Sequence, residues 1–245
     1  DIFQNLKMAE MFWIHLIQKL IDPASEKNER IPQSSSELAM NQNEYLIRQA
    51  KISDMDDLYE ICICTGNNGE DAHHLYNIHE ALGIYYVGPY VVFEQELAFV
   101  LEDKLGICGY VLGTKDTKLF FQTLTEQWLP KYQNCFPMPD GDAENWNHDQ
   151  KIVALIHHPN ISLPESLNDF PAHLHIDLLP RARKKGNGRR MIDTLHKKLK
   201  KFGIKGVFLD VGINNINAQS FYERIGYKNR EVTPSQDGLF MIQQL

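Results

Sequence analysis

The chain has 245 residues, of which 43% are hydrophobic and 23% charged, and its formal net charge is −7. This composition is ordinary for a globular protein with a buried core. It contains no run that approaches the roughly 18 apolar residues of a membrane span, and its four scattered cysteines are too few for a disulfide framework. We therefore expect a protein of a reducing, intracellular compartment without a membrane partner.

The charge is distributed unevenly along the chain. Residues 181–205 contain eleven basic residues and one acid, a net charge of +10, so the rest of the chain carries −17. A solvated helix face is one interpretation of such a basic stretch. A locally anionic ligand is the other, and an acidic body argues against a general nucleic-acid binder.

The first 44 residues are expected to be an appendage. Residues 2–21 place apolar side chains at helical spacing, which predicts an amphipathic helix. Residues 23–42 are polar and predict a flexible linker. A tethered helix cannot bury its apolar stripe alone, so we expect it to dock on the main domain, on a second copy or on a further part of the protein.

The main domain is predicted to span residues 45–245. Its first half alternates short β runs, helical patterns and loops, which we place as a strand at 45–48, a helix from Ser53 or Asp54, a hairpin of strands 97–101 and 107–112, a helix at 120–132 and an exposed loop at 137–148. Its second half is predicted as strand 173–179, helix 188–202, strand 207–211, helix 218–225 and strand 239–242. This order predicts a mixed α/β fold.

The strand that ends at Pro180 leads into a short basic loop with Gly186 and Gly188, and a helix begins directly afterwards. A helix start offers unpaired N–H groups and the positive end of the helix dipole. Glycines let a pyrophosphate approach the backbone. The pattern thus predicts a phosphate site, with a tight strand-to-helix turn as the alternative. It lacks the Gly-Lys-Ser/Thr of a P-loop and the third glycine of a dinucleotide fingerprint.

The spacing Arg183-x-x-Gly186-x-Gly188 resembles the acetyl-CoA loop of the GNAT acetyltransferases, Gln/Arg-x-x-Gly-x-Gly/Ala. Residues 215–227 resemble the second signature of that family, Asn-x-x-Ala-x-x-Phe-Tyr-x-x-x-Gly-Phe/Tyr. Alone, Phe221-Tyr222 would be interpreted as core packing. Together and in this order, the two motifs imply the GNAT fold: a mixed α/β (α+β) central sheet with a splayed acetyl-CoA cleft and helices on both faces.

Over residues 45–245 the chain is also similar to the C-terminal acetyltransferase-like domain of the animal O-GlcNAcases, which remove GlcNAc from proteins with a separate glycosidase domain. The similar segments are 45–48, 58–62, 99–103, 106–114, 163–165 and 170–171. This resemblance implies a glycosidase domain and protein substrates as partners, a homodimer, and a cytoplasmic or nuclear location. The glycine loop is a departure, because the vertebrate domains of this type lack it and are regarded as pseudo-acetyltransferases.

The GNAT resemblance also implies roles for individual residues. Amides near Leu178 and Leu179 would polarise the thioester carbonyl, and Asn217 would contact the pantetheine arm. Tyr222 would protonate the departing thiolate. The pyrophosphate would be held by the loop residues Arg183, Lys184, Lys185, Gly186, Asn187, Gly188 and Arg189.

The attacking amine must be neutral, so a base or a water chain is required. His173, His175 and Asp177 alternate along one strand and share a face, which makes His175 and Asp177 candidate catalytic residues beside Tyr222. A buried polar ladder is the alternative interpretation. We expect no metal, because Cys62-x-Cys64 and the His73-His74 and His157-His158 pairs do not match the spacing of zinc ligands.

Two functions follow from the sequence. The first is a non-catalytic GNAT-fold module that serves dimerisation and places protein substrates beside a glycosidase domain. The second is an active acetyl-CoA-dependent N-acetyltransferase. The animal resemblance and the unpartnered N-terminal helix slightly favour the module, whereas the intact loop and Tyr222 favour the enzyme.

Overall fold

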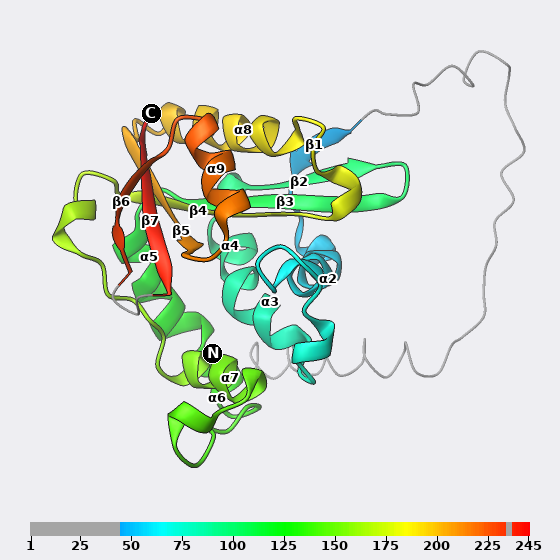
Figure 1. The fold of residues 1–245 in the computed structure, drawn as a ribbon, viewed down its shortest axis with the longest axis vertical. Helices are drawn as coiled ribbons and strands as arrows, with labels where there is room; N and C mark the ends of the chain where they lie inside the picture. The colour runs from blue at the N-terminus through cyan, green and yellow to red at the C-terminus, as the bar shows by residue number, and fades with distance from the viewer. Residues whose placement is uncertain (1–44, 234–236) are drawn as a thin grey trace, which may run out of the picture. The chain divides into compact units, whose positions relative to one another are not determined.

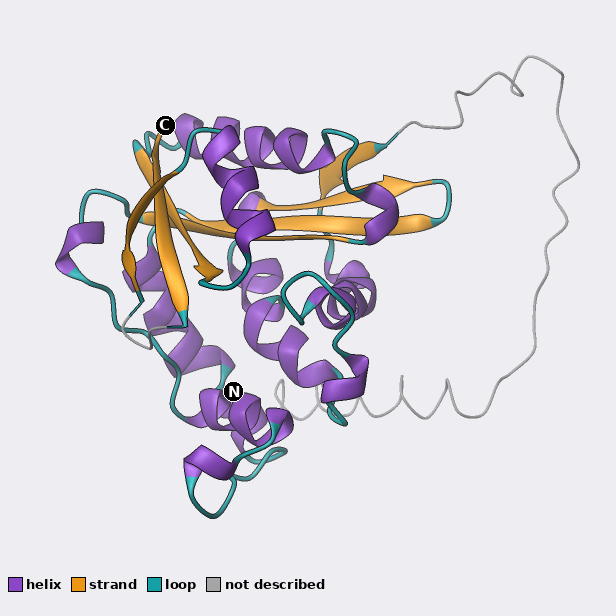
Figure 2. Ribbon diagram, in the orientation of Figure 1, coloured by secondary structure: helices purple, strands orange, loops and turns teal. Residues whose placement is uncertain are grey.

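The computed structural model describes residues 45–233 and 237–245, so the predicted helix at 2–21 and the linker at 23–42 lie outside the described residues. A seven-stranded mixed sheet in the order β1-β2-β3-β4-β5-β7-β6 forms the centre (Figures 1 and 2). Among the described helices, none has both the length and the apolar character that a membrane span requires.

The first four strands form an antiparallel half-sheet, with β1 at Leu46–Gln49, β2 at Ala98–Asp103, β3 at Gly106–Thr114 and β4 at Ala172–Leu178. A tight turn joins β2 to β3 and confirms the predicted hairpin. Side chains of β3 alternate between the two faces. Tyr110 and Leu112 pack on one face and Val111 on the other, and all three are fully buried.

Helices α2 (Met55–Thr65), α3 (Glu80–Tyr86) and α4 (Gly88–Phe93) cover one face of this half-sheet (Figure 1). Helix α2 presents Leu58, Ile61 and Cys62 to the core. Gly83 lets α3 approach α2 closely, because a Cβ there would lie 2.3 Å from the Tyr59 ring. Three further helical segments, α5 (Thr117–Thr123), α6 (Pro130–Gln133) and α7 (His148–His157), extend from this side of the sheet.

Helix α8 (Asn187–Lys201) covers the opposite face. Met191, Ile192, Leu195 and Leu199 form its apolar stripe and are buried almost completely. Lysines cluster in its last turn, where positive charge complements the helix dipole. The predicted basic stretch is therefore partly the solvated face of an amphipathic helix.

The sheet continues beyond β4 with β5 (Gly206–Gly212), β7 (Gly238–Gln244) and β6 (Lys228–Val232), and α9 (Ile216–Arg224) connects β5 to β6. All strands and helices predicted for the second half of the chain are present, with ends within two residues of the predicted ones. The sheet strand β6 and the helices α3, α4 and α7 were not predicted. The predicted helix at 120–132 consists of α5, a π-helical turn at Leu124–Trp128, and α6.

Candidate active site

The central feature of the site is a gap in the middle of the sheet. Strands β4 and β5 are parallel but pair at only two positions, Ala172 with Val207 and His173 with Phe208. Both strands continue for several residues beyond this point, β4 to Leu178 and β5 to Gly212. The predicted splayed cleft is thus confirmed, and backbone groups of β4 that would bond to β5 face an opening instead.

The two leucine amides predicted to bind an acyl oxygen lie differently. The Leu179 N–H donates to the Cys108 carbonyl on β3 at 2.9 Å, so this amide already has a partner within the sheet. Antiparallel pairing alternates its bonded positions, so the neighbouring Leu178, opposite Gly109, directs its N–H away from β3 and toward the gap. Leu178 is therefore the amide donor that the split leaves available.

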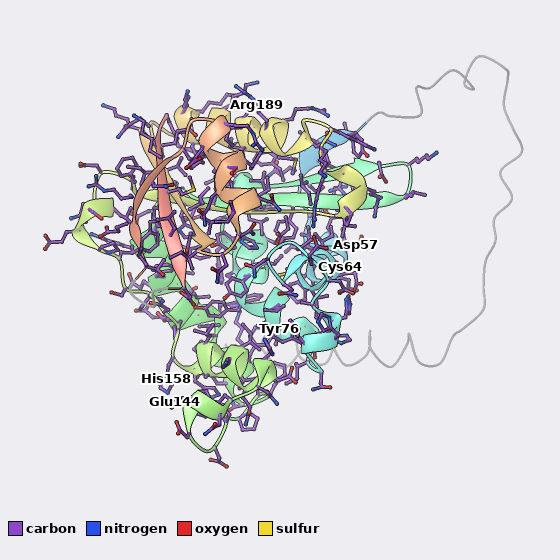
Figure 3. All side chains as sticks on the ribbon, in the orientation of Figure 1. Asp57, Cys64, Tyr76, Glu144, His158 and Arg189 are labelled. Carbon is purple, nitrogen blue, oxygen red and sulfur yellow. The ribbon has the colours of Figure 1, made fainter. Side chains whose placement is uncertain are left out.

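The loop before α8 has the shape of an anion-binding turn. Lys184 and Gly186 both have left-handed backbone angles, φ 59° and 75°. A Cβ built on Gly186 would meet no atom within 4 Å, and Gly186 provides no side-chain cap to the helix. The N–H groups that open the first turn of α8 are thus free to face an anion. Lys184 is exposed in this loop, and the exposed Arg189, labelled in Figure 3, lies in the first turn of α8, 3.8 Å from the Asp193 carboxylate.

Three other loop residues that were predicted to hold pyrophosphate have structural partners. Arg183 donates to the Leu178 carbonyl at 2.7 Å and to the Gly69 carbonyl, and it lies 3.7 Å from the Glu70 carboxylate. The Lys185 ammonium donates to the Tyr45 hydroxyl at 2.8 Å. Asn187 is buried, and its amide donates to the Ala182 carbonyl at 3.0 Å. These side chains brace the loop.

Gly188 and Asn217 lie near α9. A Cβ on Gly188 would lie 3.0 Å from the Phe221 ring, so this glycine permits the close packing of α8 against α9. Asn217 is exposed in the first turn of α9. The preceding Asn215 caps that helix by accepting a hydrogen bond from the Ala218 N–H at 3.1 Å.

A hydrogen-bonded group on β3 and β4 faces the α2 side of the sheet. The Tyr110 hydroxyl donates to Asp177 Oδ2 at 2.6 Å, and His175 Nε2 lies 3.1 Å from both of these oxygens. The side chains of His175 and Asp177 retain 31% and 20% exposure, so a substrate can reach them. The Cys62 thiol belongs to the same group, and burial raises its pKa well above the usual range. The structure therefore brings the two predicted catalytic residues of β4 together.

Tyr222 belongs to the apolar cluster on the other face of the sheet, where α8 packs. It lies on α9, packed with the side chains that cover α8. Burial raises the pKa of its hydroxyl, and the Asp177 carboxylate raises it further. Tyr222 thus remains protonated at neutral pH.

His173 shares the β4 face but is no candidate for the base. It is only 7% exposed, its Nε2 lies 2.6 Å from the Tyr90 hydroxyl, and its Nδ1 lies 2.8 Å from the Thr117 hydroxyl. Burial lowers its pKa to about 3. For this residue the alternative interpretation, a satisfied buried polar group, is the correct one.

A cavity of about 490 Å³ adjoins the gap on the α3 side. His175 and the rings of Tyr85, Tyr86 and Phe121 line it, and Asp210 of β5 contributes a carboxylate. The Tyr86 ring stacks on His175 with centroids 5.9 Å apart. Partial desolvation at the cavity, together with the charge of Asp237, raises the pKa of the exposed Asp210 carboxyl to about 6.

Comparison with known proteins agrees with this geometry. Residues 115–227 match the acetyltransferase (GNAT) family. SsHAT, a protein of known crystal structure, is 32% identical, with a TM-score of 0.76 over 82% of this chain and 98% of its own. The chain belongs to the GNAT acetyltransferase family. The crystal structure of PH1933 from Pyrococcus horikoshii, 17% identical over 82% of this chain and 99% of its own with a TM-score of 0.53, shares the fold.

This GNAT domain is also similar to Protein O-GlcNAcase of Mus musculus and of Rattus norvegicus. Each is 30% identical over 183 residues, which is 74% of this chain but 20% of the relative. The chain thus spans about a fifth of the length of these curated relatives. The matched part of them is their C-terminal region.

Sequence reasoning missed the cavity residues of the GNAT domain. Asp210 lies in a strand that was predicted, but its place in the cavity with His175 depends on how far β5 separates from β4. Tyr85 and Tyr86 lie in α3, which was not predicted. A pair of aromatic residues next to a glycine-containing apolar segment was the available signal.

Proposed function

We propose that this domain binds acetyl-CoA and transfers its acetyl group to an amine. The observation that carries the proposal is the gap between β4 and β5, which joins two differently equipped faces. The Tyr222 hydroxyl comes from the α9 face, and the His175–Asp177 pair lies on the α3 face. An acyl group in the gap would meet a proton donor on one side and a proton acceptor on the other.

The residues around the gap fit acetyl-CoA, a cofactor that supplies an acetyl group activated as a thioester. The uncapped start of α8 offers N–H groups to a pyrophosphate, and Lys184 and Arg189 add positive charge. Gly186 leaves the approach open, because no atom lies within 4 Å of its Cβ direction. The Leu178 N–H is directed at the gap, where a donor stabilises the negative charge that develops on a carbonyl oxygen.

Side chains of this domain can carry out both proton transfers of the reaction. His175 Nε2 faces the Asp177 carboxylate and the Tyr110 oxygen, to which it can donate, so the other ring nitrogen, Nδ1, accepts a proton from the incoming ammonium and makes the amine nucleophilic. Tyr222 supplies a proton to the sulfur that leaves. Burial and the Asp177 charge raise the pKa of this hydroxyl, so it carries its proton at neutral pH.

The cavity beside His175 is the acceptor side of this proposal. Its aromatic rings provide faces that attract a cation, and Asp210 provides a negative charge. A primary amine, which is an ammonium ion in solution, would therefore concentrate next to the base.

A second candidate function is a non-catalytic module of a longer protein. The similarity to the C-terminal region of the O-GlcNAcases supports it, because that region is a fifth of a larger chain. In this case the domain would accompany a glycosidase domain, act within a homodimer and help place protein substrates. Such a protein would work in the cytoplasm or nucleus.

Two glycines of α8 allow a matched test of the cofactor site. Gly186 and Gly203 have φ 75° and 76°, and neither has an atom within 4 Å of its Cβ direction, but they lie at opposite ends of the helix. We expect Gly186→Asp to weaken acetyl-CoA binding at least about tenfold, roughly 1.4 kcal/mol, in isothermal titration. Gly203→Asp should bind as the wild type does.

The result separates the proposals. Equal binding by both variants, or no binding by the wild type, would overturn the cofactor assignment. If the cofactor binds, turnover with a panel of amines should fall by a factor of about 10² in Tyr222→Phe, as for loss of a general acid. Binding without turnover in the wild type would favour the module.

A further inference from the structure

A second cluster of reactive side chains lies on the outer side of α2, away from the gap. Glu60 and Cys64 are four residues apart on that helix and therefore share a face. The following loop returns His73 to the same place. Figure 3 labels Cys64 on α2, on the opposite side of the sheet from Arg189.

The three side chains converge on one point. The Cys64 thiol donates to Glu60 Oε1 at 3.5 Å, and His73 Nε2 lies 3.4 Å from the same oxygen. The sulfur, the nitrogen and the oxygen all lie within 4.8 Å of one another. Metal–ligand distances of about 2.0–2.3 Å in a tetrahedron place neighbouring ligand atoms roughly 3.3–3.7 Å apart, so small side-chain movements would complete such a site.

The orientation of His73 is fixed by a fourth residue. Its Nδ1 lies 2.6 Å from Asp71 Oδ1, which also accepts the His73 backbone N–H at 3.1 Å. A carboxylate on Nδ1 holds the imidazole with Nε2 free to coordinate, an arrangement found behind most metal-bound histidines. Asp71 is thus a positioning residue for the ligand set.

We propose that Glu60, Cys64 and His73 bind a divalent transition-metal ion of the zinc type, with water in the remaining position. Mixed sulfur, nitrogen and carboxylate donors suit Zn²⁺ and exclude Mg²⁺ or Ca²⁺, which take oxygen ligands. The three ligands stand at chain spacings of four and nine residues. Common zinc sites use closely spaced pairs of Cys or His ligands. The spacing of these three ligands differs from that pattern.

A bound ion would also affect the turn between its ligands. Between Cys64 and His73 the chain forms a turn closed by a bridge of Asn67 with Glu70. Arg183, which braces the loop before α8, bonds to the Gly69 carbonyl and lies near Glu70. An ion with ligands at both ends of this turn would stabilise the segment that Arg183 contacts.

Titration of the purified chain with Co²⁺ and Zn²⁺ tests the proposal. We expect the wild type to develop a thiolate-to-cobalt charge-transfer band that Zn²⁺ abolishes. Cys64→Ser should lose the band and bind Zn²⁺ more than about 100-fold more weakly, and Asp71→Asn should bind it about 10–100-fold more weakly. Cys135→Ser is the matched control, because Cys135 is an exposed cysteine outside the cluster, and it should match the wild type.

Circular dichroism of each variant before titration establishes that it is folded, and the exposed position of Asp71 makes folding of its variant secure. A wild type without the charge-transfer band would overturn the proposal. So would a Cys64→Ser variant that keeps the band, or one that binds Zn²⁺ as tightly as the wild type.

Discussion

The buried state of His173 gives a prediction whose size can be worked out from the structure. Its pKa is about 3 in the folded protein, against 6.5 for an ordinary histidine, because burial excludes the charged form. A base with a depressed folded pKa contributes stability that is fully present above pH 6.5 and is lost as the pH falls toward 3. At pH 5 His173 is protonated in the unfolded chain but not in the folded protein. Because pH 5 lies 1.5 units below the ordinary pKa of 6.5, this difference lowers the free energy of unfolding by about 2 kcal/mol.

The measurement compares urea unfolding of the wild type and His173→Gln at pH 7, 6 and 5. Between pH 7 and pH 5 the wild type should lose about 2 kcal/mol more unfolding free energy than the variant. Other groups titrate in both proteins, so their contributions cancel in the difference. They include His196, for which burial lowers the pKa to about 4, and Asp210, for which the raised pKa has the opposite effect on the pH dependence of stability. Equal losses in the two proteins would show that His173 is charged and would restore it as a candidate base.

Two further predictions concern the acceptor cavity and the core. Because partial desolvation and Asp237 raise the pKa of Asp210 to about 6, the KM for a cationic amine should fall as the pH rises through 6. In Asp210→Asn the KM should be about tenfold higher and lack this step, which steady-state kinetics from pH 5 to pH 8 would show. In Gly83→Ala the added Cβ would lie 2.3 Å from the Tyr59 ring, so urea unfolding should show a loss of about 2–3 kcal/mol. An unchanged stability would mean that α2 and α3 can separate freely.

The elements predicted correctly from the sequence are those in which local pattern and tertiary role agree. Helix α8 is the clearest example, since its apolar stripe, its glycines at both ends and its basic last turn all indicate a helix. Strand β4 is similar, because it ends at a proline and alternates along its length. Their places in the two motifs then implied the GNAT fold around them.

The helices that were missed are those in which tertiary packing overrides local preference. Helices α3 and α4 contain Gly83, Gly88 and Pro89, which favour a loop when considered locally. Each glycine is required by a neighbour, since a Cβ on Gly83 would meet Tyr59 and one on Gly88 would lie 2.3 Å from Trp128. The residues that make the close packing possible are the ones that obscure the helical pattern.

The site was predicted to the level of a strand face but not to the level of single residues. Alternation places His173, His175 and Asp177 on one face of β4, and the structure confirms this. The alternation alone does not show that Phe120 packs against His173 while His175 lines a cavity. That distinction depends on α5 and on the distance between β4 and β5, neither of which a strand pattern contains.

The gap also explains why an arginine stands at the start of the glycine loop. A strand that loses its neighbour exposes both a carbonyl and an amide, and each needs a partner. Arg183 covers the Leu178 carbonyl from the loop itself, and its own position is held by Gly69 and Glu70. Because the Leu178 carbonyl is covered, the Leu178 N–H is the backbone group of this residue that remains directed at the gap. Arg183 thus changes the polarity of the gap by covering a hydrogen-bond acceptor. The positive charge of the loop also acts on any anion that approaches α8.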